Sequence, residues 1–155
     1  DPEENKNYVP YVLETSIGLD RMFLAVFSNS LKNEELENNS TRTVLKLPAV
    51  LAPTKAAILP LVKKDGLPEI AKEILQELQW EFNVAYDEKD AVGRRYRRQD
   101  AIGTPFCITI DHQTIEDNTV TVRYRDSMKQ ERVAVKNLKT LIEDHVSMKN
   151  WLKNC

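Results

Sequence analysis

The stretch KAAILPLVKKDGLPEIAKEILQELQWEFNVAYD, residues 55–87, decides the fold of the chain. Its first part, AAILPLV at 56–62, is a short continuous apolar run, which is typical of a strand covered on both faces. A turn follows at 65–69, where Pro68 is tolerated because it falls in the first turn of a helix. FNVAY at 82–86 has the composition of a second strand. This order predicts a β-α-β unit with parallel strands and a right-handed crossover. Between the strands, apolar residues recur at helical spacing: Ile70, Ile74, Leu75 and Leu78.

Downstream of this unit the pattern continues with strands. Three further strands are predicted, within TPFCITI (104–110), TVTVRYRD (119–126) and SMKQERVAV (127–135). Residues 92–103 are expected to form a loop and short helix, 115–119 a hairpin-type connection, and 136–155 a terminal amphipathic helix. From Val44 onward the order is therefore β-α-β-α-β-β-β-α. This order predicts an α/β fold with one mixed sheet, parallel at its core and flanked by helices.

Upstream of residue 44 the chain changes character. Residues 8–13 are rich in strand formers, and Ser16 is a candidate cap for a helix over 19–27. That helix is apolar on more than one face, so it is expected to pack against more protein than residues 1–30 supply. NSLKNEELENNSTRT, 29–43, is polar and is interpreted as a linker. We therefore expect a boundary at residue 40, with one unit over 1–40 and a second over 41–155.

Composition excludes several classes of protein. The chain has 155 residues, 41% hydrophobic and 30% charged, which is typical of a soluble globular protein. No apolar run approaches the roughly 18 residues that span a membrane. The first residues are acidic, are unlike a signal or transit peptide, and lack an initiator Met, so we expect a processed or excised chain. The two cysteines, Cys107 and Cys155, form no disulfide framework, which favours a reducing, cytoplasmic setting. The two histidines lack ligand spacing, so no metal site is expected.

Charge is distributed unevenly along the chain. Residues 1–40 carry eight acids and three bases, a net charge of −5, whereas residues 41–155 carry sixteen acids and nineteen bases, a net charge of +3. The densest basic cluster is VGRRYRRQDAIG, 92–103, preceded by Lys89. Arginine forks match phosphates, and guanidinium planes and tyrosine rings stack on unpaired bases. The alternative is a solvated helix whose arginines pair with Asp100 and its neighbours.

A second basic feature lies on the alternating strand at 119–126. Thr121, Arg123 and Arg125 share one face, opposite the face of Val120, Val122 and Tyr124. Two arginines so close on a sheet repel each other unless something anionic lies between them. The local acids at positions 117 and 126 are one candidate for this role. A polyanionic ligand, particularly single-stranded or looped RNA, is the other.

The stretch ETSIGLDR, 14–21, contains the remaining chemistry. A carboxylate at a strand end, a glycine at the turn and an arginine in the first helical turn can hold an ammonium group beside a polyphosphate. The alternative is a capped helix with a surface salt bridge. We find no catalytic pairing: there is no glycine-rich phosphate loop and no Cys/His dyad, and Cys107 is interpreted as a small apolar strand residue.

These stretches together resemble a known family. YVPYVLETSIGLDR, 8–21, is similar to motif 3 of class II aminoacyl-tRNA synthetases. Residues 52–74, 93–111 and 116–133 resemble the C-terminal anticodon-binding domain of dimeric glycyl-tRNA synthetases. The resemblance covers nearly the whole chain; at Thr15 the family usually has proline. It implies a class IIa anticodon-binding domain, preceded by a strand-helix remnant of the catalytic domain.

The resemblance also implies site residues. The carboxylate of Glu14 would hold the α-ammonium of glycine, Ser16 would help to close a small pocket, and Arg21 would contact ATP. The implied glycine site comprises Glu14, Thr15, Ser16, Ile17 and Gly18, and the implied ATP site comprises Gly18, Leu19, Asp20 and Arg21. The implied tRNA anticodon surface comprises Arg94, Arg95, Arg98, Glu116, Arg123 and Arg125, with Glu116 as a candidate acceptor that reads a base.

Motifs 1 and 2 of the family are absent, so we expect a C-terminal fragment of a glycyl-tRNA synthetase. The implied parent reaction joins glycine to its tRNA through an adenylate, with ATP and Mg. The fragment alone is expected to be inactive, because motif 2 supplies the arginine that orients the α-phosphate, and to need no cofactor. A homodimeric parent is implied, whereas the fragment alone could be a monomer. The alternative is a non-enzymatic accessory subunit of a DNA polymerase, which GLDR at 18–21 argues against because such a subunit binds no ATP.

Overall fold

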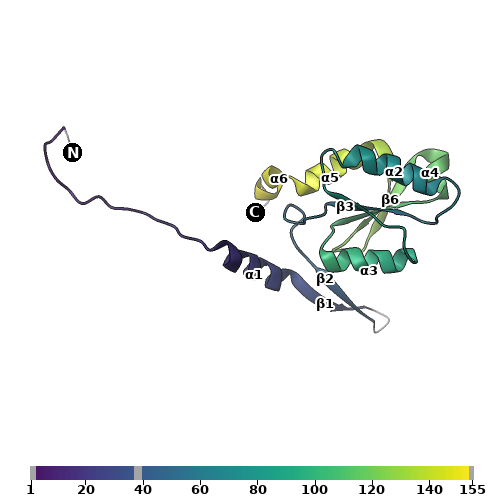
Figure 1. The fold of residues 1–155 in the computed structure, drawn as a ribbon, viewed down its shortest axis with the longest axis horizontal. Helices are drawn as coiled ribbons and strands as arrows, with labels where there is room; N and C mark the ends of the chain where they lie inside the picture. The colour runs from purple at the N-terminus through teal and green to yellow at the C-terminus, as the bar shows by residue number, and fades with distance from the viewer. Residues whose placement is uncertain (1–2, 37–39, 154–155) are drawn as a thin grey trace.

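The computed structural model describes residues 3–36 and 40–153 and has a five-stranded mixed sheet at its centre (Figure 1). The strand order is β4-β3-β5-β6-β7. β3 pairs in parallel with both β4 and β5, whereas β6 runs antiparallel to β5 and to β7. The predicted mixed sheet with a parallel core is therefore confirmed. The strands are β3 (Ala56–Pro60), β4 (Val84–Tyr86), β5 (Phe106–Ile110), β6 (Thr119–Tyr124) and β7 (Gln130–Ala134).

Helices cover both faces of this sheet. On one face, α2 (Leu67–Leu78) and α5 (Leu138–Val146) enclose the larger core, which includes Ile58 and Ile108. On the other face, α3 (Val92–Ile102) covers a smaller cluster around Leu59 and Cys107 (Figure 1). All five residues of β3 are buried, because β3 lies between two strands and two helical layers. The continuous apolar run is thus explained by burial on both faces.

Two connecting segments differ from the sequence prediction. The loop and short helix expected at 92–103 is an eleven-residue helix, α3, which ends at Gly103 with φ of 84°. The hairpin expected at 115–119 is instead a short helix, α4 (His112–Asp117). Asp111 caps α4 by accepting a hydrogen bond from the Thr114 N–H, while the Thr114 hydroxyl accepts one from the Asp111 N–H. This local capping box stabilises a helical turn that strand propensity did not indicate.

The terminal helix expected at 136–155 is divided within its described part. A 3-10 turn, η1 (Val135–Asn137), leads into α5, and a separate α6 (Met148–Lys153) follows. Ser147 between them has extended backbone, with φ of −68° and ψ of 120°. Its hydroxyl accepts a hydrogen bond from the Asn150 N–H at 3.3 Å. Serine therefore acts at this position as a cap that starts a new helix.

The N-terminal part projects away from the sheet (Figure 1). The predicted strand at 8–13 is absent, because no described segment pairs with it. The predicted helix exists as α1 (Leu19–Ser30), but Gly18 occupies its N-cap position and no side chain caps it. Ser16 is therefore not the cap. A strand needs a partner for its backbone groups, and strand-forming side chains alone do not supply one.

The polar stretch interpreted as a linker largely forms a β-hairpin. β1 (Leu31–Glu35) pairs antiparallel with β2 (Thr41–Leu45), and Leu31 lies opposite Leu45. The hairpin spans residue 40, where the domain boundary was expected. In β2 the buried positions include Arg42 and Val44. A strand whose inward residue is an arginine shows no apolar alternation, which is why the pattern suggested a linker.

Candidate nucleic-acid interface

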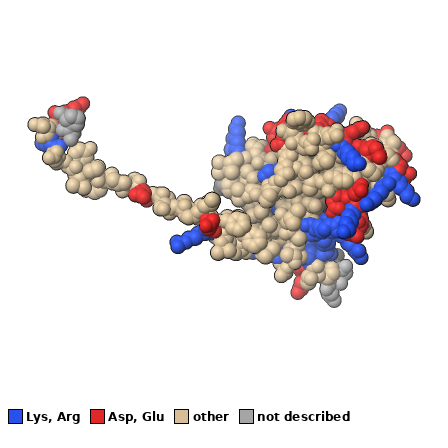
Figure 2. All heavy atoms as spheres, in the orientation of Figure 1, with Lys and Arg blue, Asp and Glu red and all other residues tan. Residues whose placement is uncertain are grey.

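The helix α3 holds all four arginines of the basic cluster, and it directs them to different environments. Figure 2 shows basic side chains gathered over the part of the domain that carries α3, interspersed with acidic ones. The side chain of Arg94 is 78% exposed, and its guanidinium lies 4.0 Å from the Asp90 carboxylate. Arg97, one turn away, is also exposed and donates a hydrogen bond to the carbonyl of Thr41 at 2.9 Å. These two guanidiniums offer donors to an approaching anion.

Arg98 is partly exposed but already paired with acids. Its guanidinium donates to the carboxylate of Asp87 at 2.7 Å and to that of Asp90 at 2.9 Å, and also to the carbonyl of Lys89. Burial raises the pKa of Asp87, but hydrogen bonds from the Lys89 N–H and from Arg98 outweigh it and hold that pKa below its ordinary value. Arg98 can therefore reach a phosphate only by exchanging these partners.

Arg95 points inward and is 2% exposed. Its guanidinium donates to the carbonyl of Pro60 at 2.6 Å, to that of Leu61 at 3.2 Å and to that of Asp87 at 3.3 Å. Pro60 is the last residue of β3, and Leu61 and Asp87 directly follow β3 and β4. Arg95 therefore fixes α3 to the sheet, and the expectation that it lies on a tRNA-facing surface is corrected: the helical period turns it toward β3.

Arg123 and Arg125 are also buried, contrary to the expectation that both face RNA. Arg123 donates two hydrogen bonds to the carboxylate of Asp100, at 2.8 and 3.0 Å, and its guanidinium lies 4.8 Å from the centre of the Tyr96 ring. Arg125 donates to two backbone carbonyls and to Asp126. Within the protein, Asp100 of α3 is therefore the anion that neutralises Arg123, in the position where an anionic ligand was one of the two expectations.

Of the two local acids that the sequence offered as partners for Arg123 and Arg125, only Asp126 pairs with either of them. Asp126 does pair with Arg125, at 2.8 Å. Asp117 instead accepts hydrogen bonds from Thr119 and lies 3.6 Å from Arg132. The carboxylate that neutralises Arg123 is Asp100, which is fully buried and lies 23 residues earlier in the chain. The alternative in which the helix arginines pair with Asp100 and its neighbours therefore holds in part. Arg94 and Arg98 pair with Asp90 and Asp87. The partners of Asp100 are Arg123 and Arg42, which lie on strands.

Glu116 is exposed on α4. In Figure 1, α4 and α3 lie on different sides of the sheet, so the structure does not bring Glu116 beside Arg94. Arg97 was not among the predicted site residues. Its position three residues after Arg94, on the same helix face, is the sequence signal that could have identified it.

The residues of the implied glycine and ATP sites do not form a closed pocket. Residues 14–17 are exposed and have neither helical nor strand structure, and Gly18 begins α1. Arg21 lies exposed in the first turn of α1. The described residues therefore do not enclose a space for glycine or for adenine, and the glycine-site and ATP-site assignments stay predictions.

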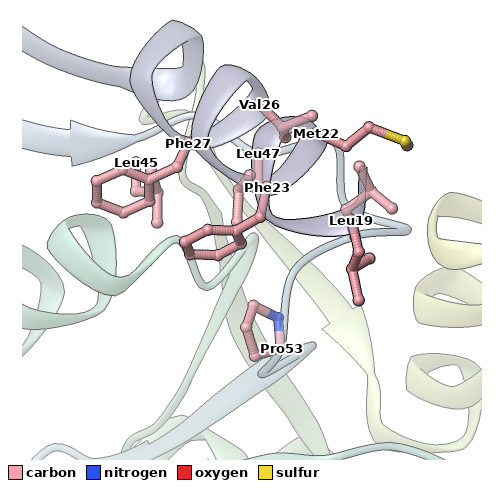
Figure 3. A pocket seen from close by; sticks show the side chains of 9 residues that line it. Leu19, Met22, Phe23, Val26, Phe27, Leu45, Leu47 and Pro53 are labelled. Atoms are coloured by element: carbon pink, nitrogen blue, oxygen red, sulfur yellow. The ribbon is translucent and has the colours of Figure 1, made fainter. Parts of the chain in front are cut away.

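An apolar groove lies where α1 meets the hairpin and the following loop (Figure 3). Its volume is about 500 Å³, and all of its lining residues are apolar, so it offers no polar group to orient a nucleotide. Phe23 and Phe27 stack with ring centres 5.8 Å apart. The lining residues are Leu19, Met22, Phe23, Val26, Phe27, Leu45, Leu47, Leu51 and Pro53.

The thiol of Cys107 has a structural role. Cys107 is buried in β5, and burial raises the pKa of its thiol to about 12, which suits the apolar role predicted for it. Among residues 3–36 and 40–153, no group of three His, Cys, Asp or Glu side chains could hold a metal ion. Within the same ranges, no helix is long and apolar enough to cross a bilayer.

Comparison with known proteins connects this geometry to a family. Residues 55–145 match the model of the anticodon binding domain. The chain is 53% identical over 147 residues to the glycine–tRNA ligase of Clostridium perfringens, covering 92% of this chain and 31% of the relative. It is 47% identical to that of Borrelia hermsii, covering 90% and 31%. The chain thus spans about a third of the length of these curated relatives.

Solved structures show the same fold. The RNA binding domain of threonyl-tRNA synthetase from Cryptosporidium parvum superposes with a TM-score of 0.59 at 25% identity, covering 64% of this chain and 25% of that one. Prolyl-tRNA synthetase from the same organism, solved with L-proline and AMP, gives a TM-score of 0.60 at 21% identity, covering 71% and 25%. The second likeness concerns the fold alone.

Proposed function

The chain belongs to the anticodon-binding domain family, and from that premise we propose that it is the tRNA-recognition part of a glycine–tRNA ligase. The identity of about half of the residues to two ligases supports the proposal. The observation that carries the RNA-binding role is the pair Arg94 and Arg97, whose exposed guanidiniums lie one turn apart on α3. Both relatives are named glycine–tRNA ligase, which favours a ligase over a polymerase accessory subunit.

In this proposal the arginines of α3 have separate roles. Arg94 and Arg97 bind phosphates of the anticodon loop, and Arg98 contributes when a phosphate replaces Asp87 or Asp90 as its partner. Arg95 holds the helix in place from beneath. Glu116, on α4, is retained as an acceptor for a base edge at a separate point of contact. Arg123 and Arg125 support the surface from inside instead of contacting RNA.

The N-terminal segment has a different proposed role in the whole ligase. Residues 1–40 would belong to the edge of the catalytic domain, with Glu14 to Gly18 at the glycine site and Gly18 to Arg21 at the ATP site. The exposed apolar face of α1 supports this, since it would be covered by the remainder of a protein about three times as long. The whole protein would use ATP and Mg, act as a homodimer and work in the cytoplasm, and residues 41–155 would serve as the anticodon-binding domain.

The test is binding of an anticodon stem-loop RNA from glycine tRNA. Arg94→Ala should weaken binding severalfold and lower the slope of log affinity against log salt by roughly 0.7 to 0.9, the loss expected for one phosphate contact. Because Arg94 is 78% exposed, the free energy of unfolding should stay within about 0.5 kcal/mol of the unmodified protein. A filter-binding titration between low and physiological salt measures both affinity and slope.

The matched control is Lys136→Ala, which removes an exposed charge from η1 at the far side of the sheet from α3. It should leave both the affinity and the salt slope unchanged. Equal effects of the two variants would mean that only net charge matters, and the assignment of the surface to α3 would be wrong.

A further inference from the structure

The β1–β2 hairpin is fastened to α3 by a buried ionic contact. The side chain of Arg42, in β2, is 1% exposed. Its Nη1 donates to the carboxylate of Asp100 at 3.0 Å and to the carbonyl of Arg125 at 3.0 Å. Asp100 is the single acidic residue of α3 and is fully buried. This buried contact favours one geometry, because separation of hairpin and helix would break the hydrogen bonds of Arg42 to Asp100 and to the carbonyl of Arg125.

Both acids that contact Arg42 also have a second cation. Asp100 accepts two hydrogen bonds from Arg123. Glu34, in β1, accepts from Arg42 Nε at 2.7 Å and is also paired with Lys46. The hydrogen bond from Lys46, together with those from Arg42, lowers the pKa of Glu34. Loss of Arg42 would therefore remove the ionic contact between hairpin and helix without leaving either carboxylate unpaired.

Weaker contacts reinforce the same tie. Arg97, on the exposed face of α3, donates to the carbonyl of Thr41 in β2 at 2.9 Å. Arg125, which follows β6, donates to the carbonyl of Leu47 at 2.7 Å and so joins the chain just after β2 to the sheet domain. The hairpin is in turn continuous with α1, because α1 ends at Ser30 and β1 begins at the next residue. The hairpin thus connects the two helices: its first strand continues from α1, and its second strand contacts α3.

We propose that Arg42 is a positioning residue that locks the hairpin, and with it α1, onto the RNA-facing helix α3. The inference rests on the proposed function, in which the anticodon loop binds at α3 and the acceptor end of the same tRNA reaches the catalytic part to which α1 belongs. Two contacts made by one ligand reinforce each other only when the sites are held at the spacing of that ligand. A loosened hairpin would lose this gain while each separate contact stayed intact.

The test compares two RNAs on the whole ligase that contains this chain. Arg42→Met should raise the KM for full-length glycine tRNA roughly tenfold, because part of the effective-concentration gain is lost. The Kd for the isolated anticodon stem-loop should change less than about twofold, and so should the rate of tRNA-independent adenylate formation from glycine and ATP. A loss of folded protein would instead lower the rate of adenylate formation and the amount of each RNA bound at saturation together.

Two further variants complete the design. Lys139→Met breaks an exposed pair with Glu81, away from the hairpin, and should change none of the three values. Arg42→Lys keeps the positive charge but removes the guanidinium fork, so it should give a smaller rise in KM. If Arg42→Met does not fold, Arg42→Lys serves for the comparison of full-length tRNA with the stem-loop.

Three results would overturn the proposal. Equal weakening toward stem-loop and full tRNA would place Arg42 in the RNA surface or in folding itself, and no change toward either RNA in a folded variant would remove the positioning role. If the unmodified ligase binds neither RNA, the proposed function fails first and the positioning role fails with it.

Discussion

Arg94 and Arg95 are neighbours in the sequence, yet one is 78% exposed and the other 2%. A helix turns about 100° per residue, so adjacent side chains point to different surroundings. Arg95 finds three backbone carbonyls beneath α3, and Arg94 finds solvent beside Asp90. The same chemical group is therefore a structural clamp at one position and an available phosphate ligand at the next.

Asp87 allows a test of the ion pair that occupies Arg98. Its folded pKa is below the unfolded value of about 3.9. This carboxylate therefore contributes stability above that pH, and the contribution is lost as pH falls through the folded pKa. Asp87→Asn should lower the free energy of unfolding by about 1 kcal/mol at pH 7 and by less at pH 3. Urea unfolding at the two pH values measures the difference.

The control for this prediction is Asp144→Asn, on the exposed side of α5. It should leave the free energy of unfolding at pH 7 nearly unchanged. A loss in Asp87→Asn that is the same at both pH values would show that the ionised form of Asp87 contributes no stability.

At the scale of elements, the C-terminal end of α3 lies close to the hairpin. Gly103 ends the helix in the left-handed region, and a Cβ there would lie 3.1 Å from the carbonyl oxygen of Leu45. Only glycine satisfies both the backbone angle and the contact. The close approach brings β2 near enough for Arg42 to reach Asp100. The end of one helix thus sets the position of the hairpin.

Gly103→Ala should therefore lower the free energy of unfolding by about 1 to 3 kcal/mol, because it adds both strain in φ and a close contact with β2. The matched change is Gly93→Ala at the start of the same helix, where nothing lies within 4 Å of the added carbon. That variant should be neutral or more stable by up to about 1 kcal/mol, because alanine favours the helix. Chemical denaturation measures the free energy of unfolding of both variants. Equal changes in the two would show that the backbone angle and the close contact at Gly103 impose no special requirement for glycine.

At the scale of the whole molecule, the sheet domain is well enclosed but α1 is not. The apolar side chains of α1 remain exposed, and the groove beside them is lined only by apolar residues. Exposed apolar patches of this kind are typical of surfaces covered by other protein. The shape in Figure 1, a closed domain with a projecting helix and tail, is consistent with a part that functions within a larger chain.

The isolated 155-residue chain should therefore associate with itself in a concentration-dependent way. Phe23→Glu should shift sedimentation toward monomer, because Phe23 is 68% exposed within the apolar face of α1. Trp80→Glu, which removes a single aromatic residue that is 85% exposed outside the groove, should have a smaller effect. A chain that sediments as a monomer at high concentration, before any substitution, would contradict the expectation.

The sequence by itself determined the β-α-β unit, the mixed sheet and the two faces of β6, because burial on both faces leaves continuous apolar runs and a half-buried strand leaves alternation. Motif resemblance supplied the family. The sequence could not determine which arginines are exposed and able to bind an outside partner. Whether Arg123 contacts a ligand or Asp100 depends on a helix 23 residues away in the chain folding over the sheet. The hairpin was missed because its inward residue is Arg42, whose burial is possible only once Asp100 is in place. Ion pairs form between groups that are close in the folded protein, whatever their separation in the sequence. Only the tertiary structure therefore decided which positive charges are neutralised inside the protein and which remain for an outside partner.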